Sequence, residues 1–169
     1  LGVDCTLIKE NENLPYLPRY GFLLNPNENL FDKVEWKGFG PNENYSDYKE
    51  AAKVGTYSKD IKDMFYEYVS PQENGERCGI SHLSLFGKSG AKLSVYAKGD
   101  FFSFKVNDFI GKDLQAARQI TDLKRGETLE LAIDGYFSGV GSNSCGPELP
   151  EDKRITDKVL NFGVYFRFE

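Results

Sequence analysis

The sequence predicts an all-β domain, built as a sandwich or barrel, and three observations point to this fold class. Short runs of alternating apolar and polar residues recur along the chain, as is typical of strands with one buried face. Clusters of Gly, Pro and Asn separate these runs and are typical of turns. Aromatic residues make up 14% of the 169 residues, and large flat side chains favour pleated sheets.

The alternation is clearest in the second half of the chain. Over residues 92–98, Leu93, Val95 and Ala97 share one face while Ser94 and Tyr96 share the other. Strands are expected, in chain order, at residues 3–9, 19–24, 32–38, 77–86, 92–98, 101–106, 128–134 and 158–169. Helical spacing is confined to residues 111–118 and, with less signal, 47–52.

Charge and hydropathy exclude two classes of partner. The net charge is −5 and no basic stripe is present, whereas a protein that follows a phosphate backbone needs one, so we expect no nucleic-acid partner. No apolar run approaches the roughly 18 residues that a membrane-spanning helix requires. We therefore expect no membrane partner.

The cysteines and the histidine indicate little about catalysis. Cys5, Cys78 and Cys145 are odd in number and far apart, which argues against a disulfide framework and favours a reducing, cytoplasmic location. Without a Cys-x-x-Cys pair, and with His82 as the single histidine, no metal site is expected. The apolar neighbours of His82 favour a structural position on a strand.

The beginning of the chain is unusual for a complete sandwich. The chain starts at Leu1, and only one strand-like stretch precedes Arg19. A sandwich normally supplies paired strands to both sheets, so we expect that upstream partner strands of this domain are missing.

The first of three notable loops runs from Trp36 to Asp47 (WKGFGPNENYSD). An aromatic ring can cover the apolar face of a sugar, and the side chains of Glu43 and Asn44 can bind its hydroxyl groups. The alternative interpretation is a buried tryptophan beneath a turn, with asparagines bonded to their own backbone.

The second loop runs over residues 68–79 (YVSPQENGERCG) and the third over 136–150 (YFSGVGSNSCGPELP). In the second, Glu73 and Asn74 are candidate ligands, but Asn-Gly is also a standard turn former. The third is too long for a tight hairpin, and long loops in compact domains often carry function. For this third loop, a ligand-binding role and a purely connecting role are both consistent with the sequence. No pair of carboxylates stands out for glycoside hydrolysis.

Taken in order, these loops resemble one family. The strings VEWKGFGPNENYSDYKEAAKVGTY, YVSPQENGERCG and GVGSNSCGPELP are similar to the C-terminal domain of the large β-galactosidases of glycoside hydrolase family 2, and to the small subunit of their two-chain forms. The resemblance runs from about residue 19 to residue 169, and the ordered set of strings is far more specific than any one loop.

The resemblance implies a fold and a division of labour. The fold would be an antiparallel β-supersandwich of the galactose-mutarotase type, with residues 1–169 forming its C-terminal part. The catalytic glutamates of this family lie on a separate TIM-barrel domain, so this chain would contain no catalytic residue and no cofactor of its own. Divalent and monovalent cations would belong to that barrel, in an enzyme that hydrolyses β-D-galactosides such as lactose with retention.

The resemblance also implies a binding role. The loop containing Asn143, Ser144 and Cys145 would border the aglycone side of the substrate, where some members carry Trp in place of Cys145. The partners would be the remaining domains or the large subunit, the β-galactoside itself, and other protomers of an oligomer. Because each of the three loops follows a strand, we expect them to gather at one end of the sandwich, with Trp36 and Glu73 near Cys145.

Two other functions are considered. A free-standing carbohydrate-binding module is the main alternative, and galactose affinity of the isolated chain would favour it. An aldose mutarotase is the other, since such enzymes resemble the expected fold. They use a pair of histidines, however, and His82 cannot supply a pair.

Overall fold

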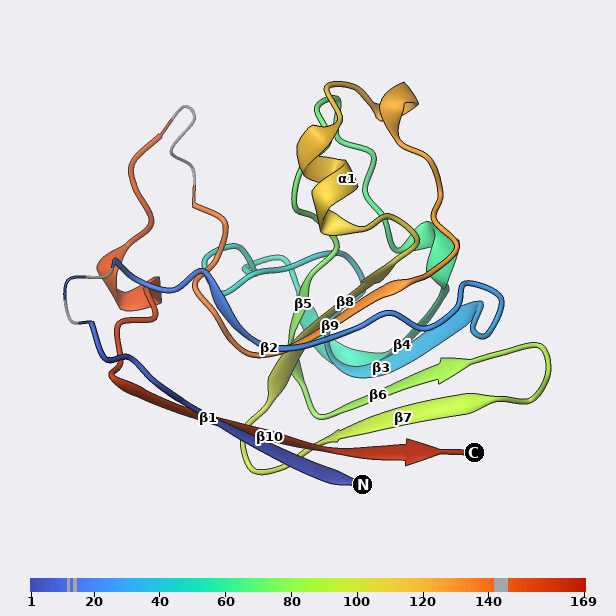
Figure 1. The fold of residues 1–169 in the computed structure, drawn as a ribbon, viewed down its shortest axis with the longest axis horizontal. Helices are drawn as coiled ribbons and strands as arrows, with labels where there is room; N and C mark the ends of the chain where they lie inside the picture. Colours follow the sequence, from blue (N-terminus) through green and yellow to red (C-terminus); the bar gives the residue numbers. More distant parts are fainter. Residues whose placement is uncertain (12, 14, 142–145) are drawn as a thin grey trace.

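The computed structural model describes residues 1–11, 13, 15–141 and 146–169, which form two antiparallel sheets (Figure 1). The larger sheet has six strands in the order β1-β10-β7-β6-β3-β4, and the smaller has four in the order β2-β9-β8-β5. The strands are β1 (Gly2–Ile8), β2 (Arg19–Leu24), β3 (Lys33–Gly40), β4 (Lys53–Asp60), β5 (Arg77–Ile80), β6 (His82–Phe86), β7 (Lys92–Ala97), β8 (Phe102–Asn107), β9 (Glu130–Phe137) and β10 (Val159–Phe168). The predicted all-β sandwich is confirmed.

Helical structure in the described residues is short. The helix α1 covers Gly111–Ala116, inside the predicted range 111–118. Single 3₁₀ turns lie at Ile61–Asp63, Ile120–Asp122 and Glu151–Lys153. In Figure 1, α1 and the connection that precedes β5 rise side by side next to the smaller sheet. The ring centroids of Phe65 and Phe109, 4.7 Å apart, hold these two connections together.

Strand β10 illustrates how alternation sets the layers. Phe162 and Phe166 are buried, whereas Tyr165 is 47% exposed. Antiparallel pairing places Phe162 opposite Cys5 of β1 and Phe166 opposite Val95 of β7. Directly paired residues point to the same side of a sheet, so these apolar side chains form one continuous inner face.

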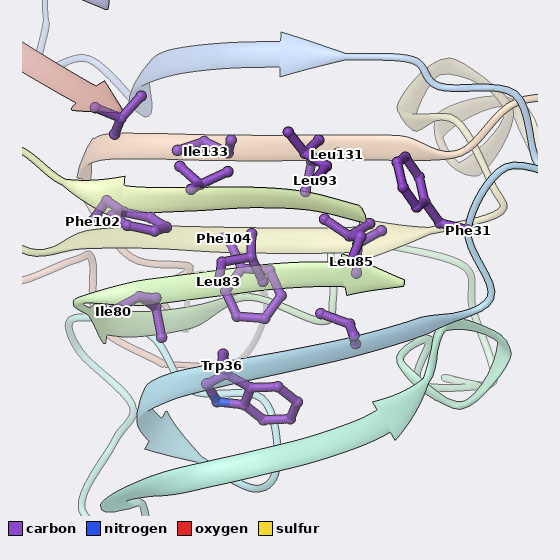
Figure 2. Close-up of a cluster of buried hydrophobic side chains, with 14 of the residues drawn as sticks. Phe31, Trp36, Ile80, Leu83, Leu85, Leu93, Phe102, Phe104, Leu131 and Ile133 are labelled. Carbon is purple, nitrogen blue, oxygen red and sulfur yellow. The ribbon is translucent and has the colours of Figure 1, made fainter. Parts of the chain in front are cut away.

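The core fills the space between the two inner faces (Figure 2). Trp36 and Leu83 come from the larger sheet, and Phe104 and Ile133 come from the smaller; none of the four has exposed surface. The indole of Trp36 meets the ring of Phe104 edge-on, with centroids 5.7 Å apart. The two sheets are therefore joined by direct contact of aromatic side chains.

One predicted strand, 77–86, is in fact two. Strand β5 pairs with β8 in the smaller sheet, whereas β6 pairs with β3 and β7 in the larger. Gly79 lies inside β5, where the pairing with β8 is irregular; it has φ +66°, and a Cβ at this position would lie 2.7 Å from the ring of Phe39. A glycine is needed there because of this backbone conformation and the close approach of Phe39. The chain then passes to the larger sheet through Ser81.

Over residues 47–60 one expectation is wrong and one strand was missed. Residues 47–52 form turns and not a helix: Tyr45 and Tyr48 exchange backbone hydrogen bonds, and Ala52 N donates to Lys49 O. Strand β4 was not predicted, because as an edge strand it contains no fully buried residue and carries lysines at positions 53 and 59. Burial of one face is what produces a readable alternation.

Candidate functional site

The three loops lie together, as predicted, as far as the structure describes them. We call residues 41–52 the first loop, 66–76 the second loop and 138–141 the described start of the third. The first loop follows β3, the second precedes β5, and the third follows β9. Three residues of the first loop bond the other two loops: Glu43 and Asp47 accept hydrogen bonds from backbone N–H groups, and Asn44 donates one to a backbone carbonyl. The first loop is thus the connector of the group.

Glu43 joins the first loop to the second. Its carboxylate accepts a hydrogen bond from the backbone N–H of Gly75, at 2.7 Å, and another from the hydroxyl of Tyr68. Burial raises the pKa of Tyr68, and the hydrogen bond to Glu43 raises it further. The tyrosine therefore stays a neutral donor, and Glu43 serves to fix the second loop.

Asn44 makes a second set of bonds between the same loops. Its side chain is almost fully buried. Its backbone N–H donates to Glu76 O at 2.8 Å, and its Oδ1 accepts from the backbone N–H of Cys78 at 3.0 Å. Its Nδ2 donates to Asn42 O at 3.0 Å. These contacts match the alternative in which the asparagine closes a turn.

Asn74 has a similar role inside the second loop. It is 1% exposed. Its Oδ1 accepts from the backbone N–H of Tyr66 at 3.0 Å, and its Nδ2 donates to Gln72 O at 2.9 Å. Both polar ends of the amide are occupied by backbone, so Asn74 shapes the loop from within.

Trp36 belongs to the core and has no face for a sugar. It has no exposed surface. Its Nε1–H donates to Phe39 O at 3.0 Å, which satisfies the single polar atom of the ring. Its ring centroid lies 5.5 Å from that of Tyr57 and 5.5 Å from the guanidinium carbon of Arg77. The expectation that Trp36 contributes to a sugar-binding rim is corrected: the buried-tryptophan interpretation describes it.

Asp47 was not predicted, and it is the residue that reaches the third loop. Its carboxylate accepts hydrogen bonds from the backbone N–H groups of Val140, at 3.2 Å, and Gly141, at 2.9 Å. Gly139 has φ +92°, and a Cβ at this position would lie 2.2 Å from Asp47 Oδ1. The carboxylate and the glycine are therefore fitted to each other. The remaining candidates, Asn143, Ser144 and Cys145, lie outside the described residues.

A buried network of charges lies beside the second loop. It joins carboxylates and cations from β2, β8, β9 and residues 73–76: Glu73, Glu76, Glu130, Asp134, Arg19 and Lys105. Arg19 bonds Glu73 at 3.3 Å, Glu76 at 3.1 Å and also Asp134. Lys105 bonds Glu73 at 3.0 Å and Glu130 at 3.1 Å. Glu73 thus contacts both cations, which explains its position in this loop better than a sugar ligand does.

Burial controls the chemistry of this network. Burial and, to a smaller extent, the charge of Asp134 raise the pKa of Glu76 to about 8, and Arg19 opposes the shift. Burial also raises the pKa of Asp134, against the hydrogen bond from Arg19. Glu76 has no exposed surface and Asp134 has 4%. A sugar ring cannot reach these two carboxylates, so the network is suited to holding the loop and not to glycoside chemistry.

The first loop also encloses a hollow of about 360 Å³, lined by residues 40–44 and 47–52. Within the described ranges, no group of three or more His, Cys, Asp or Glu side chains could hold a metal ion. In the same part of the chain, no helix is long and apolar enough to cross a membrane.

Known proteins match the chain over nearly its whole length. A family model described as the β-galactosidase small chain matches residues 1–166. The β-galactosidase of Kluyveromyces lactis is 35% identical over 156 residues, which are 92% of this chain and 15% of that protein. That of Actinobacillus pleuropneumoniae is 35% identical over 170 residues, 98% of this chain and 16% of that protein. That of Vibrio vulnificus strain YJ016 is 31% identical over 169 residues, 99% of this chain and 15% of the relative.

Proposed function

The chain belongs to the β-galactosidase small-chain family, and from this premise we propose that it is a non-catalytic domain of a β-galactosidase. The observation that supports the proposal is its coverage: the chain spans about 15% of the length of the curated relatives it matches. The whole enzyme would be a retaining hydrolase of glycoside hydrolase family 2 that cleaves terminal β-D-galactosides such as lactose. Its catalytic glutamates, and any cations, would lie in parts of the enzyme outside this chain.

The burial of the charge network supports a non-catalytic role. Retaining hydrolysis needs two carboxyl groups about 5–5.5 Å apart that both contact the sugar. In the network of this chain, Glu73 is the most open carboxylate, with a side chain 35% exposed, while those of Glu130 and Asp134 are 10% and 4% exposed. These carboxylates offer no open pair to a substrate.

The grouping of the loops supports a role at the rim of the active site. Near the start of the third loop, Asp47 accepts hydrogen bonds from the backbone N–H groups of Val140 and Gly141. We propose that Asn143, Ser144 and Cys145 border the aglycone side of the galactoside, and that other faces of the domain contact the rest of an oligomeric enzyme. We also propose a cytoplasmic location, because Cys5 and Cys78 are both free thiols.

The isolated chain is expected not to hydrolyse an activated β-galactoside such as a nitrophenyl galactoside, because oriented carboxyl groups supply most of the rate. Release of nitrophenol should equal that of buffer over hours, while the whole enzyme under the same conditions turns over. Turnover by the chain that disappears when Glu73 or Asp134 is replaced would contradict the proposal. Galactose affinity of the inactive chain would favour the carbohydrate-binding module instead.

Cys145→Trp in the whole enzyme is expected to tighten the binding of glucose-like acceptors about 2- to 12-fold, because an aromatic face adds about 0.5–1.5 kcal/mol against a sugar. Inhibition by galactose should change little, since the galactose subsite would belong to the barrel. Val140→Trp is the matched control, because it adds the same ring before the segment in question.

The competing expectation is that Cys145 is packed as a small apolar residue. Tryptophan would then overpack the site and lower stability by about 1–3 kcal/mol. Acceptor affinity and melting temperature should be measured on the same variant. A large fall in melting temperature without a gain in acceptor affinity would remove Cys145 from the rim.

A further inference from the structure

Asp47 lies at the tip of a short turn that is tied to strand β9. Tyr45 and Tyr48 exchange backbone hydrogen bonds, at 2.9 and 3.0 Å. Residues 46 and 47 thus form a two-residue loop, the shortest common hairpin connection. Tyr45 is 3% exposed, and its ring centroid lies 5.6 Å from that of Phe137, where β9 ends. The carboxylate of Asp47 is therefore held beside the strand from which the third loop starts.

The third loop is closed at its base by one hydroxyl group. Ser138 has no exposed surface. Its hydroxyl donates to Leu17 O and accepts a hydrogen bond from the backbone N–H of Ile155 at 3.0 Å, which holds residues 138 and 155 together. The returning arm has its own support, because Leu149 is 3% exposed and the guanidinium of Arg154 donates to Leu149 O at 2.8 Å. The base and the returning arm are thus fixed by contacts of their own.

The outgoing arm of the loop, residues 139–141, is rich in glycine. Gly139 and Gly141 have φ values of +92° and +67°, and glycine loses more conformational freedom on folding than any other residue. The carboxylate of Asp47 accepts hydrogen bonds from the backbone N–H groups of Val140, at 3.2 Å, and Gly141, at 2.9 Å. Charge-assisted bonds to two successive N–H groups fix both the position and the direction of a segment. The path of the outgoing arm is therefore set from the first loop.

We propose that Asp47 is a positioning residue for the aglycone side of the active site. It acts through the outgoing arm, whose placement decides where the third loop meets the acceptor sugar. The inference rests on the proposed rim role of this loop, and it extends that role to a residue 93 positions before Val140. Affinity for the acceptor sugar should therefore depend on Asp47, whereas affinity for galactose, whose subsite would lie in the barrel, should not.

Asp47→Ala in the whole enzyme is expected to weaken the binding of glucose as an acceptor at least about fivefold, because only a fraction of the loops would then occupy the binding position. The glucose dependence of galactosyl transfer from a nitrophenyl galactoside measures this affinity. Inhibition by galactose should change by less than about twofold, since its contacts do not involve the loop. Glu50→Ala is the matched control, because it removes an exposed carboxylate of the same loop, and it should change neither quantity.

Gly139→Ala tests the same contact from its other side. A Cβ at this position would lie 2.2 Å from Asp47 Oδ1, and φ +92° is a conformation that alanine rarely adopts. Glucose affinity should therefore fall in this variant too. The double variant should lose less affinity than the product of the two single losses, because both changes disturb one contact. A double loss equal to that product would show that the residues act independently and would overturn the proposal.

Hydrogen exchange of the whole enzyme, resolved by peptide, measures the state of the arm without any sugar. The amide protons of Val140 and Gly141 should exchange at least about tenfold faster in Asp47→Ala, because they lose their acceptor, while those of β9 keep their rates. Unchanged exchange of the two amides would overturn the inference and leave the rim proposal intact. Faster exchange with unchanged glucose affinity would instead overturn the rim proposal, and the inference with it.

Discussion

Arg19→Met is expected to lower the free energy of unfolding by about 3–5 kcal/mol above pH 8, because removing one partner of a buried ion pair leaves the other charges uncompensated. The carboxylates that lose their cation are Glu76 and Asp134, at 0% and 4% exposed. Urea unfolding of the chain measures the change. Lys98→Met is the matched control: its pair with Asp4 is exposed and should be worth no more than about 1 kcal/mol.

The loss should depend on pH in a defined direction. The folded pKa of Glu76 is about 8 against an ordinary value of 4.5, so between these values folding takes up a proton. The free energy of unfolding therefore falls as pH rises from 4.5 to about 8. Glu76 does not affect stability below this range, and its destabilising effect is greatest above it. Without Arg19, which opposes the shift, the pKa rises further. The cost of Arg19→Met should thus be smallest in acid and largest above pH 8.

Two outcomes separate this explanation from simple loss of packing. Glu76→Gln in the Arg19→Met background should recover part of the stability, mainly above pH 8, because it removes the uncompensated charge. A pH-independent loss, or one no larger than that of Lys98→Met, would show that Arg19 acts only through its methylene groups.

Trp36→Ala is expected to cost about 3–5 kcal/mol of stability, because it opens a cavity between the two sheets. The ring has no exposed surface and contacts Phe104 and Tyr57. Thermal and urea unfolding measure the loss. Tyr48→Ala is the matched control, since this aromatic residue of the first loop is 65% exposed and should change stability by about 0.5 kcal/mol or less.

The same pair of variants decides between the two interpretations of the tryptophan. A sugar-stacking ring would lose galactoside affinity on replacement while stability stayed constant. We expect the reverse for position 36. Unchanged stability of Trp36→Ala would contradict the placement of this ring in the core.

The sequence predicts strands where one face is buried and fails where burial is shared or absent. Strand β10 alternates cleanly because Phe162 and Phe166 point into the core. Strand β4 has no fully buried residue and gave no signal. The run 77–86 reads as one strand in the sequence, yet the chain passes from the smaller sheet to the larger at Ser81. Residues 47–52 have helical spacing but form turns. The carboxylate of Asp47 instead accepts a hydrogen bond from the backbone N–H of Val140 in the third loop.

The candidate site was predictable in place but not in detail. Loop composition singled out three segments, and their expected gathering is met by the described parts of all three. It could not indicate that the side chains of Glu43, Asn44 and Asn74 bond backbone N–H groups of other residues, because only the folded chain brings those groups close. The charge network was not predictable either: Arg19 and Asp134 are 115 residues apart, and each looks like ordinary surface charge in the sequence.

The bonding of Asp47 to the third loop has a consequence for the design of hybrid enzymes. The acceptor and its two donors are 93 and 94 residues apart, and the bond requires glycine at 139 to leave room for the carboxylate. A crossover between two parent genes anywhere from residue 53 to 137 would join a carboxylate from one parent to a loop from the other. The exchangeable unit is therefore the pair of segments, 41–52 with 138–150, and a hybrid that moves them together should keep the loop's anchor.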